Sequence, residues 1–132
     1  MKDRVVLTVI IVGSIAALAS IAGLVIIGIR RAQDASLRQS THDAVQVISR
    51  GVAAEIRAGR SPSWTEIEGN IRKLIDAGVI NASFDRDGQP ADVYGTPFRV
   101  SLSGSLLTAS SAGPDRIFGT DDDIEVATST KP

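Results

Sequence analysis

The residues Val5–Ile29 read VVLTVIIVGSIAALASIAGLVIIGI and contain no charged side chain. Their polar side chains are those of Thr8, Ser14 and Ser20. As an α-helix this stretch would be roughly 37 Å long, whereas the hydrocarbon core of a bilayer is about 30 Å thick. A helix also satisfies its own backbone hydrogen bonds, as a segment inside lipid must. The stretch therefore predicts a transmembrane helix over Val5–Ile29, preceded by a short flank of residues 1–4.

Two other classes of apolar segment fit this stretch less well. A signal peptide has an apolar region of about 7–15 residues, followed by a cleavage site with small residues. Here the apolar run has 25 residues and ends at Arg30-Arg31. A buried core helix of that length needs a larger protein than 132 residues, because a small domain buries too little surface. We therefore expect the segment to be retained and to lie in a membrane.

The charged residues are unevenly distributed, although the whole chain has a net charge of −1. Residues 30–60 carry six arginines against three acidic residues, and residues 61–132 carry six basic against eleven acidic residues. A basic segment beside a span and an acidic domain beyond it do not indicate nucleic acid as a partner. The absence of cysteine excludes disulfides and thiolate sites, and the single histidine, His42, cannot form a histidine metal site alone. No catalytic triad, phosphate-binding glycine loop or zinc spacing occurs, so we do not expect an enzyme.

A second helical pattern follows the apolar run directly. Between residues 30 and 60, apolar side chains recur at spacings of three and four, which is typical of an amphipathic helix. No proline interrupts residues 1–60, so the two patterns predict one continuous helix of more than fifty residues. Gly59, followed by Pro62, is expected to end it. The predicted buried stripe comprises Leu37, Thr41, Ala44, Val45, Ile48, Val52 and Ile56.

A shorter helix is predicted next. Residues 63–66 (SWTE) have the spacing of a capping box, in which a serine and a glutamate three residues later satisfy each other's backbone amides. Ile67 and Ile71 give this helix an apolar face, and Gly78 is expected to close it. We expect Trp64 to pack into the domain.

From residue 79 onward the pattern changes to short β-strands. Residues 98–102 and 106–110 read as two antiparallel strands joined by a tight turn at Gly104. The Asp85–Gly88 segment (DRDG) contains two carboxylates that could form a pair for acid–base chemistry. We interpret it instead as a turn, because Asp and Gly favour turn conformations. Residues 112–125, rich in Gly and Asp, read as a loop.

These elements together predict an α+β protein with a long N-terminal helix, a short second helix and a small antiparallel sheet. All five aromatic residues lie after residue 63, so we expect the packed body there. The predicted parts are an N-terminal flank at residues 1–4, a transmembrane helix at 5–29, an amphipathic continuation of the helix at 30–60, a globular head at 61–127 and a frayed tail at 128–132.

Two stretches of the head are similar to signatures of one family. Residues 92–98 (DVYGTPF) resemble a D-x-W-G-x-P-Y/F stretch, with Tyr94 in place of the tryptophan. Residues 111–124 (SAGPDRIFGTDDDI) resemble an SAGPDG-x-x-GT-x-DDI loop, with Arg116 in place of the glycine that follows the first aspartate. With these stretches and this order of helices, the chain resembles type IV pilin-like proteins, and among them the major pseudopilin of type II secretion systems.

The resemblance implies a structural function. It implies a single-pass protein of the cytoplasmic (inner) membrane, with its C-terminal domain in the periplasm or outside the cell. Other pilin-like or secretion-system subunits, or further copies of the chain in a homo-oligomer, would be its partners.

The apolar stretch departs from the family in one respect. Family members carry a prepilin processing site, and a glutamate lies five residues into the mature chain. Val5–Ile29 has neither that cleavage context nor an acidic residue, so these residues do not support processing by a prepilin peptidase or assembly by charge pairing with that glutamate. This leaves an alternative function, in which a permanently anchored pilin-like domain binds a protein partner without assembling into a filament.

The acidic run near the end of the sequence is a candidate cation site. Three consecutive carboxylates, Asp121–Asp123, repel one another unless a cation or hydrogen-bond donors neutralise them. Asp115 lies six to eight residues earlier, a distance that a glycine-containing loop can fold back across. Calcium accepts a mixture of carboxylate and carbonyl oxygens, which suits this composition. From the residues alone, a solvated turn is the favoured interpretation, because runs of charged residues usually form solvated surfaces.

The resemblance favours the cation, because major pseudopilins bind calcium in this loop. A bound ion would tie the loop to the sheet and stabilise the domain, with Asp121 pointing outward or in the second shell. A catalytic role for the metal is not expected. The implied calcium ligands are the side chains of Asp115, Asp122 and Asp123 and the backbone carbonyls of Ala112 and Thr120.

Overall fold

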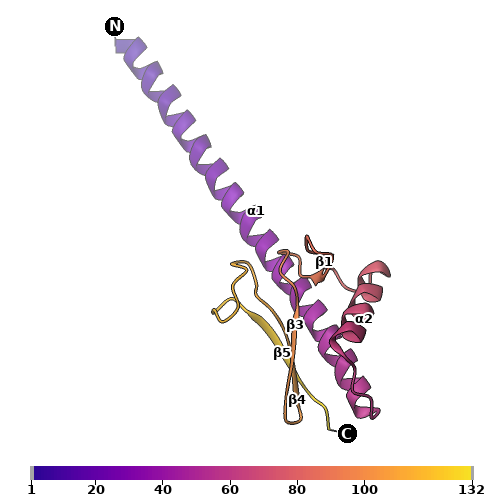
Figure 1. Ribbon diagram of the computed structural model, residues 1–132. Helices are drawn as coiled ribbons and strands as arrows, with labels where there is room; N and C mark the ends of the chain where they lie inside the picture. The colour runs from indigo at the N-terminus through magenta and orange to yellow at the C-terminus, as the bar shows by residue number, and fades with distance from the viewer. Residues whose placement is uncertain (1, 132) are drawn as a thin grey trace. The chain divides into compact units, whose positions relative to one another are not determined.

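A computed structural model of the chain describes the backbone of residues 2–131 and the side chains of Ser20 and residues 23–131. The described residues form an α+β protein with a long N-terminal helix, a second helix and a small antiparallel sheet, as predicted (Figure 1). The chain divides into two compact units, Met1–Ser36 and Leu37–Pro132. The elements are α1 (Lys2–Arg57), α2 (Trp64–Asp76), β1 (Ser83–Phe84), β2 (Pro90–Ala91), β3 (Arg99–Ser103), β4 (Leu106–Ser111) and β5 (Ile124–Ser129).

The predicted membrane span, Val5–Ile29, falls within α1. Its side chains before Gly23, apart from that of Ser20, lie outside the described residues. Among the residues that are described, no helix is both long and apolar enough to cross a membrane. Helix α1 itself has 56 residues, which confirms the predicted continuous helix of more than fifty.

Helix α1 ends where the sequence predicts. Gly59 adopts a φ of +78°, and its amide donates to the carbonyl of Ile56 at 2.9 Å. The amide of Arg60 donates to the carbonyl of Glu55 at 3.1 Å. This pair of bonds is the Schellman arrangement, which satisfies carbonyls that the last helical turn leaves open. Gly59 therefore closes the helix, because a residue without a Cβ enters the left-handed region at little cost.

The second half of α1 buries the predicted stripe. Thr41, Val45 and Ile48 are fully buried, and Ile56 packs at the edge of the core. Each large aliphatic side chain that is buried in this way stabilises the fold by about 1.5–3 kcal/mol. The stripe prediction is confirmed from Thr41 onward, whereas Leu37 is exposed.

Helix α2 begins with the predicted capping box. The amide of Ser63 donates to the carboxylate of Glu66 at 2.7 Å, and the amide of Glu66 donates to the Ser63 hydroxyl at 3.4 Å. Ile67 and Ile71 are buried and face the core. The expectation for Trp64 is wrong, because this side chain is 43% exposed. Trp64 stands on the first turn of α2, ahead of the first buried residue.

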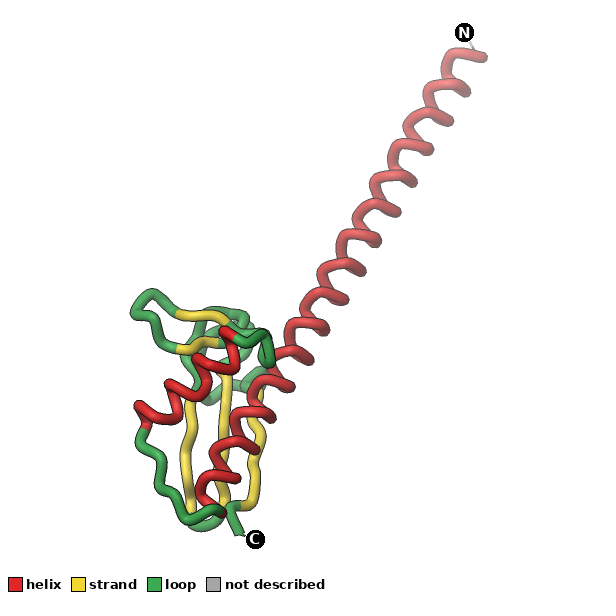
Figure 2. The backbone as a smooth tube through the Cα atoms, turned by 90° about the vertical axis from the view of Figure 1, so that its right-hand side faces the viewer, coloured by secondary structure: helices red, strands yellow, loops and turns green. Residues whose placement is uncertain are grey.

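The strands β3, β4 and β5 form an antiparallel sheet in that order (Figure 2). Val100 pairs with Ala109, and Ala109 pairs with Val126, so these side chains lie in line across one face. The β3–β4 hairpin turns at Gly104, whose φ is +60°. The two predicted strands are confirmed, with ends shifted by about one residue. A separate short pair, β1 and β2, was not anticipated by the sequence pattern.

The core lies where this sheet and α2 pack against the C-terminal part of α1 (Figures 1 and 2). All three elements contribute apolar side chains to one continuous cluster. Its members include Val45, Ile48, Ile67, Ile71, Phe98, Leu107 and Ala109.

The last strand corrects two expectations. Residues 112–125 are expected to form a loop and residues 128–132 a frayed tail, but β5 takes up Ile124–Ser129 and pairs with β4 along six residues. The side chains of β5 alternate between half-buried and exposed positions, and none of them is fully buried. A strand with no fully buried residue carries only a weak apolar pattern in its sequence.

Long-range contacts hold β5 in place. The hydroxyls of Ser49 and Thr128 lie 2.6 Å apart and share a hydrogen bond. The guanidinium of Arg57 donates to the carbonyl of Ser129 at 3.0 Å. Both partners on α1 lie more than seventy residues earlier in the chain. A local sequence pattern cannot reveal such contacts, which is why the sequence predicts a loop and a frayed tail where β5 lies.

Candidate functional site

A buried carboxylate lies at the centre of the head. Asp92 follows β2 directly, and its side chain is 0% exposed. Burying a charge is costly unless hydrogen-bond donors surround it. One carboxylate oxygen, Oδ1, accepts from the backbone amides of Tyr94 and Thr96, both at 2.9 Å. The carboxylate thereby fixes the turn that leads from β2 to β3.

The other oxygen of Asp92 joins this turn to the acidic loop. Oδ2 accepts from the hydroxyl of Ser111 at 2.5 Å, and Ser111 is itself fully buried. The Ser111 hydroxyl accepts in turn from the amide of Gly113 at 3.1 Å. The two stretches that carry the family resemblance, residues 92–98 and 111–124, are therefore connected through one buried pair of side chains.

Asp122 closes the acidic loop on itself. Its Oδ1 accepts from the hydroxyl of Thr120 at 2.6 Å, and its Oδ2 accepts from the amide of Asp115 at 3.0 Å. These hydrogen bonds, the Thr120 hydroxyl first, hold the pKa of the Asp122 carboxyl below its ordinary value. The carboxylate is therefore ionised at neutral pH and serves as an acceptor for donors of its own loop.

The other predicted ligands accept hydrogen bonds from amides near them in the chain. Asp115 accepts from the amide of Ile117 at 2.8 Å. Asp123 accepts from the amide of Gly119 at 2.7 Å. Asp121 is exposed. Each of the three implied carboxylate ligands thus has a local backbone donor.

The oxygen ligands fit the chemistry of calcium, and the structure places the implied ligands in one loop. Asp122 and Asp123 both lie next to the Thr120 hydroxyl, at 2.6 and 3.5 Å. The amide of Asp115 donates to the carboxylate of Asp122 at 3.0 Å. Within residues 2–131, no group of three or more acidic or histidine side chains is placed to hold a metal ion.

Gly113 allows the loop to return to its own start. Its φ is +66°, and a Cβ added there would lie far inside van der Waals contact with the backbone carbonyl of Asp122. Ala112, the other implied carbonyl ligand besides Thr120, is fully buried next to it. A glycine is therefore required at position 113 by both its backbone conformation and the close approach of residue 122.

Arg116 has a strained backbone conformation. Its φ of +63° lies in the left-handed region, and it is the non-glycine residue with a positive φ among those described. Its amide donates to the carbonyl of Gly113 at 3.2 Å and so closes a turn. A side chain in this conformation costs roughly 1–2 kcal/mol. The backbone thus explains why glycine suits this position.

Two arginines tie the acidic loop to the rest of the head. Arg38 of α1 donates to the backbone carbonyl of Asp122 at 3.3 Å. The guanidinium of Arg99, on β3, lies 3.7 Å from the centre of the Phe118 ring, in a cation–π contact. The loop is therefore held by a helix on one side and by the sheet on the other.

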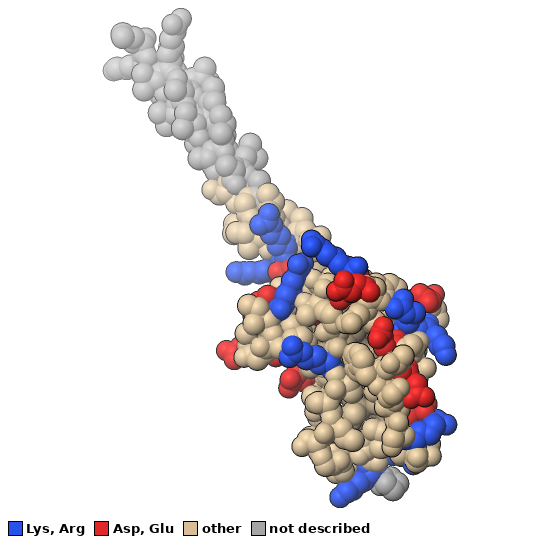
Figure 3. All heavy atoms as spheres, in the orientation of Figure 1, with Lys and Arg blue, Asp and Glu red and all other residues tan. Residues whose placement is uncertain are grey.

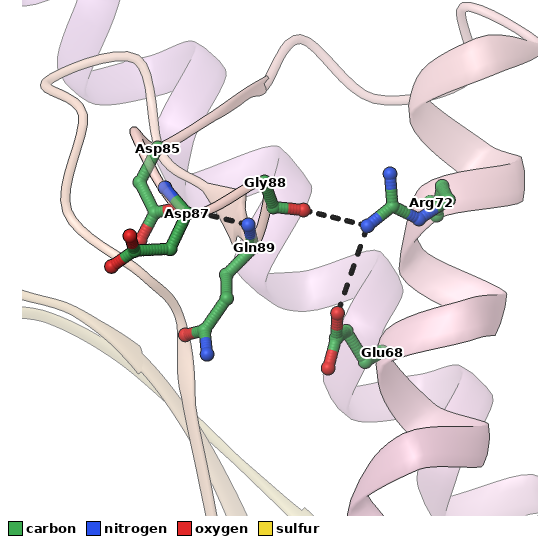
Figure 4. Close-up of polar contacts among 6 residues, drawn as sticks. All are labelled: Glu68, Arg72, Asp85, Asp87, Gly88 and Gln89. Atoms are coloured by element: carbon green, nitrogen blue, oxygen red, sulfur yellow. Dashed lines mark hydrogen bonds and ion pairs between the residues drawn. The ribbon is translucent and has the colours of Figure 1, made fainter.

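The DRDG segment is a turn, which confirms the interpretation favoured by its sequence. Asp85 accepts from the amides of Asp87 and Gln89 at 2.9 and 2.8 Å, so its carboxylate orders the turn (Figure 4). Arg72 of α2 donates to the carbonyl of Gly88 at 2.6 Å and holds the turn against the helix.

The importance of Asp92, Ser111 and Arg38 was not predicted individually. The first two lie in the stretches that carry the resemblance, which is the signal that could have found them. Arg38 gives no such signal, because it reads as one more exposed arginine of the basic segment.

Comparisons of the chain with protein-family models, with curated proteins and with solved structures found no match.

Proposed function

We propose that this chain is a structural, membrane-anchored subunit of a pilin-like assembly, related to type II secretion or type IV pilus systems. In this proposal, Val5–Ile29 crosses the cytoplasmic membrane and the head lies on its outer side. The apolar face of the anchor and the head surface then contact other subunits. The function is architectural and involves no chemical reaction.

The observation that carries this proposal is the apolar segment at the end of the anchor. Its large aliphatic side chains are each 50–71% exposed in the isolated chain. Successive helical residues point about 100° apart, so the segment is apolar around its whole circumference. A helix that is apolar on every side is stable in lipid or inside an assembly rather than in water. These residues are Leu24, Val25, Ile26, Ile27 and Ile29.

The head supports a structural function because its prominent polar groups hold its own loops. Asp92 fixes a turn and the base of the acidic loop, while Asp122 closes that loop. Arg38 and Arg99 attach the loop to α1 and β3. A firmly closed head of this kind suits a subunit that must present a constant surface to its neighbours.

Membrane fractionation tests the anchor. The full chain is expected in the membrane pellet after extraction at alkaline pH, and protease added to intact spheroplasts is expected to remove the head. A head that is protected in spheroplasts and digested only in lysed cells would place it in the cytoplasm and contradict the proposal.

Cysteine cross-linking separates assembly from the alternative of a permanently anchored, partner-binding monomer. Because the chain has no cysteine, single substitutions report on one position each. Assembly predicts that Ile26→Cys forms disulfide-linked dimers in membranes treated with an oxidant. Ser101→Cys, exposed on β3, is the matched head position. Monomers for both variants would favour the alternative, to which the lack of an acidic residue in Val5–Ile29 already points.

Calcium binding by residues 112–124 is a separate part of the proposal and rests on the resemblance. The supporting observation is the set of hard oxygen ligands concentrated in one loop. Assembly and anchoring do not depend on it, since the loop is also closed by its own hydrogen bonds.

A further inference from the structure

We propose that Arg30 and Arg31 bind the phosphate groups of anionic phospholipids and thereby give the anchor a preference for negatively charged membranes. This inference rests on the proposed membrane anchor. It adds a ligand class and the two residues that recognise it.

The two arginines follow the apolar segment immediately. Ile29 is the last aliphatic residue of the exposed apolar segment 24–29. The side chains of Arg30 and Arg31 are also exposed and belong to the same unit of the chain. Figure 3 shows basic side chains on the helix directly after the uncharged residues. In a membrane that embeds the aliphatic segment, Arg30 and Arg31 lie at the level of the lipid headgroups.

Neither arginine is neutralised by the protein. The ion pairs among the described residues join other side chains, namely His42 with Asp43, Glu55 with Arg60 and Glu68 with Arg72. Asp34 stands three and four residues further along the helix, at spacings that allow pairing, yet it forms no ion pair with Arg30 or Arg31 among the described contacts. One carboxylate could in any case balance only one of the two guanidinium groups.

The spacing of the two residues suits two separate phosphates. Adjacent helical residues differ by about 1.5 Å in height and by about 100° around the axis. Arg30 and Arg31 therefore reach the same headgroup layer on different sides of the helix. A guanidinium binds phosphate through two parallel N–H groups, and its aliphatic stem can lie along the apolar residues below.

The position selects a lipid over other phosphate ligands. A free phosphate or a nucleic acid gains nothing from the adjoining aliphatic residues 24–29. A phospholipid matches both features, because its chains contact the aliphatic residues while its headgroup contacts the arginines.

Native mass spectrometry of the full chain in detergent tests the inference, with phosphatidylglycerol and phosphatidylcholine as the probes. The natural chain is expected to retain phosphatidylglycerol in preference, by roughly fivefold per arginine. The double variant Arg30→Gln/Arg31→Gln is expected to lose this preference. The matched control is Arg50→Gln/Arg86→Gln, which removes two exposed arginines that form no described contact and should keep it.

Equal retention of the two lipids by the natural chain would overturn the inference. It would also be overturned if the control variant lost the preference for phosphatidylglycerol as fully as Arg30→Gln/Arg31→Gln does. Flotation with neutral phosphatidylcholine vesicles separates this failure from that of the proposed function. A chain that floats but shows no lipid preference contradicts only the inference. A chain that remains in the aqueous fraction contradicts the membrane anchor itself.

Discussion

The carboxylate of Asp92 accepts a hydrogen bond of 2.5 Å from the hydroxyl of Ser111, although 19 residues separate the two in the chain. Both side chains are fully buried. The pair joins the turn before β3 to the start of the acidic loop after β4. Movement of either segment away from the other would leave a buried carboxylate without one of its donors.

Asp92→Ala is expected to destabilise the head by about 3 kcal/mol or more, because the amides of Tyr94 and Thr96 and the hydroxyl of Ser111 each lose an acceptor at roughly 1–3 kcal/mol. Denaturant unfolding of the chain in detergent measures this change. The control is Asp121→Ala, which removes an exposed carboxylate and should change the free energy of unfolding by less than about 0.5 kcal/mol. Equal effects of the two substitutions would contradict the role of Asp92.

Gly113→Ala is expected to destabilise the head more than Gly88→Ala does. Both glycines have a positive φ, +66° and +78°, so each substitution introduces backbone strain of roughly 1–2 kcal/mol. Only at position 113 would the new Cβ also meet a backbone atom, the carbonyl of Asp122, whereas the space around Gly88 is open. Thermal unfolding of the two variants compares them directly. Equal melting temperatures would show that the loop does not approach Gly113 as described.

Arg116→Gly is expected to stabilise the head by about 0.5–1 kcal/mol, because relief of the left-handed strain exceeds the greater flexibility that glycine gives the unfolded chain. The matched variant is Arg86→Gly, also at an exposed turn position but with an ordinary φ. In Arg86→Gly no backbone strain is relieved, so the greater flexibility of the unfolded chain acts alone and should lower the free energy of unfolding. A loss of stability in both variants would contradict the assigned conformation of Arg116.

Stability is expected to fall at acid pH through Asp122 and Glu66. Hydrogen bonds from Thr120 to Asp122, and from Ser63 to Glu66, lower the pKa of each carboxyl in the folded state. The unfolded chain then binds more protons, so the stabilisation is complete above the ordinary carboxyl pKa of about 4 and is lost as the pH falls below it.

Asp122→Asn isolates the contribution of one of these groups. The difference in unfolding free energy between the natural chain and this variant should shrink between pH 6 and pH 3, because protonation removes the charge that the variant already lacks. A difference that stays constant over that range would mean that the loop donors do not favour the ionised form.

The calcium proposal predicts that the metal raises the melting temperature. Binding to the folded head alone stabilises it by about 2.7 kcal/mol when calcium is at one hundred times its dissociation constant. Melts with excess calcium and with a chelator measure the shift, and Asp115→Asn should abolish it, since Asp115 is one of the three proposed carboxylate ligands. An unchanged melting temperature would mean that the hydrogen bonds of Asp122 and Asp123 alone close the loop.

The helices could be predicted from the sequence because their ends are decided locally. Ser63 and Glu66 satisfy each other's amides within three residues, and Gly59 closes α1 through bonds that reach no further than Glu55. The β3–β4 hairpin is similarly local, since Gly104 alone permits the turn. In each case the residues that determine the structure are neighbours in the chain.

The site could be predicted only as a region. Asp92 reads as an ordinary turn residue, and nothing nearby in the chain indicates that Ser111 will bury its carboxylate. The implied calcium ligands do share one loop, but their side chains accept from amides that become available only once the loop has folded. Strand β5 was missed for the same reason, because its partners on α1 are distant.

The hydrogen bond between Ser49 and Thr128 spans 79 residues, and this separation sets a delay during synthesis. A ribosome adds roughly 5–20 residues per second, so β5 emerges roughly 4–16 s after the part of α1 that it covers. Until then the core that contains Val45 and Ile48 lacks the side chains of Ile124 and Val126, which β5 packs against it. The nascent chain therefore keeps part of this apolar surface uncovered until its last strand has been synthesised, an interval in which it is prone to aggregation.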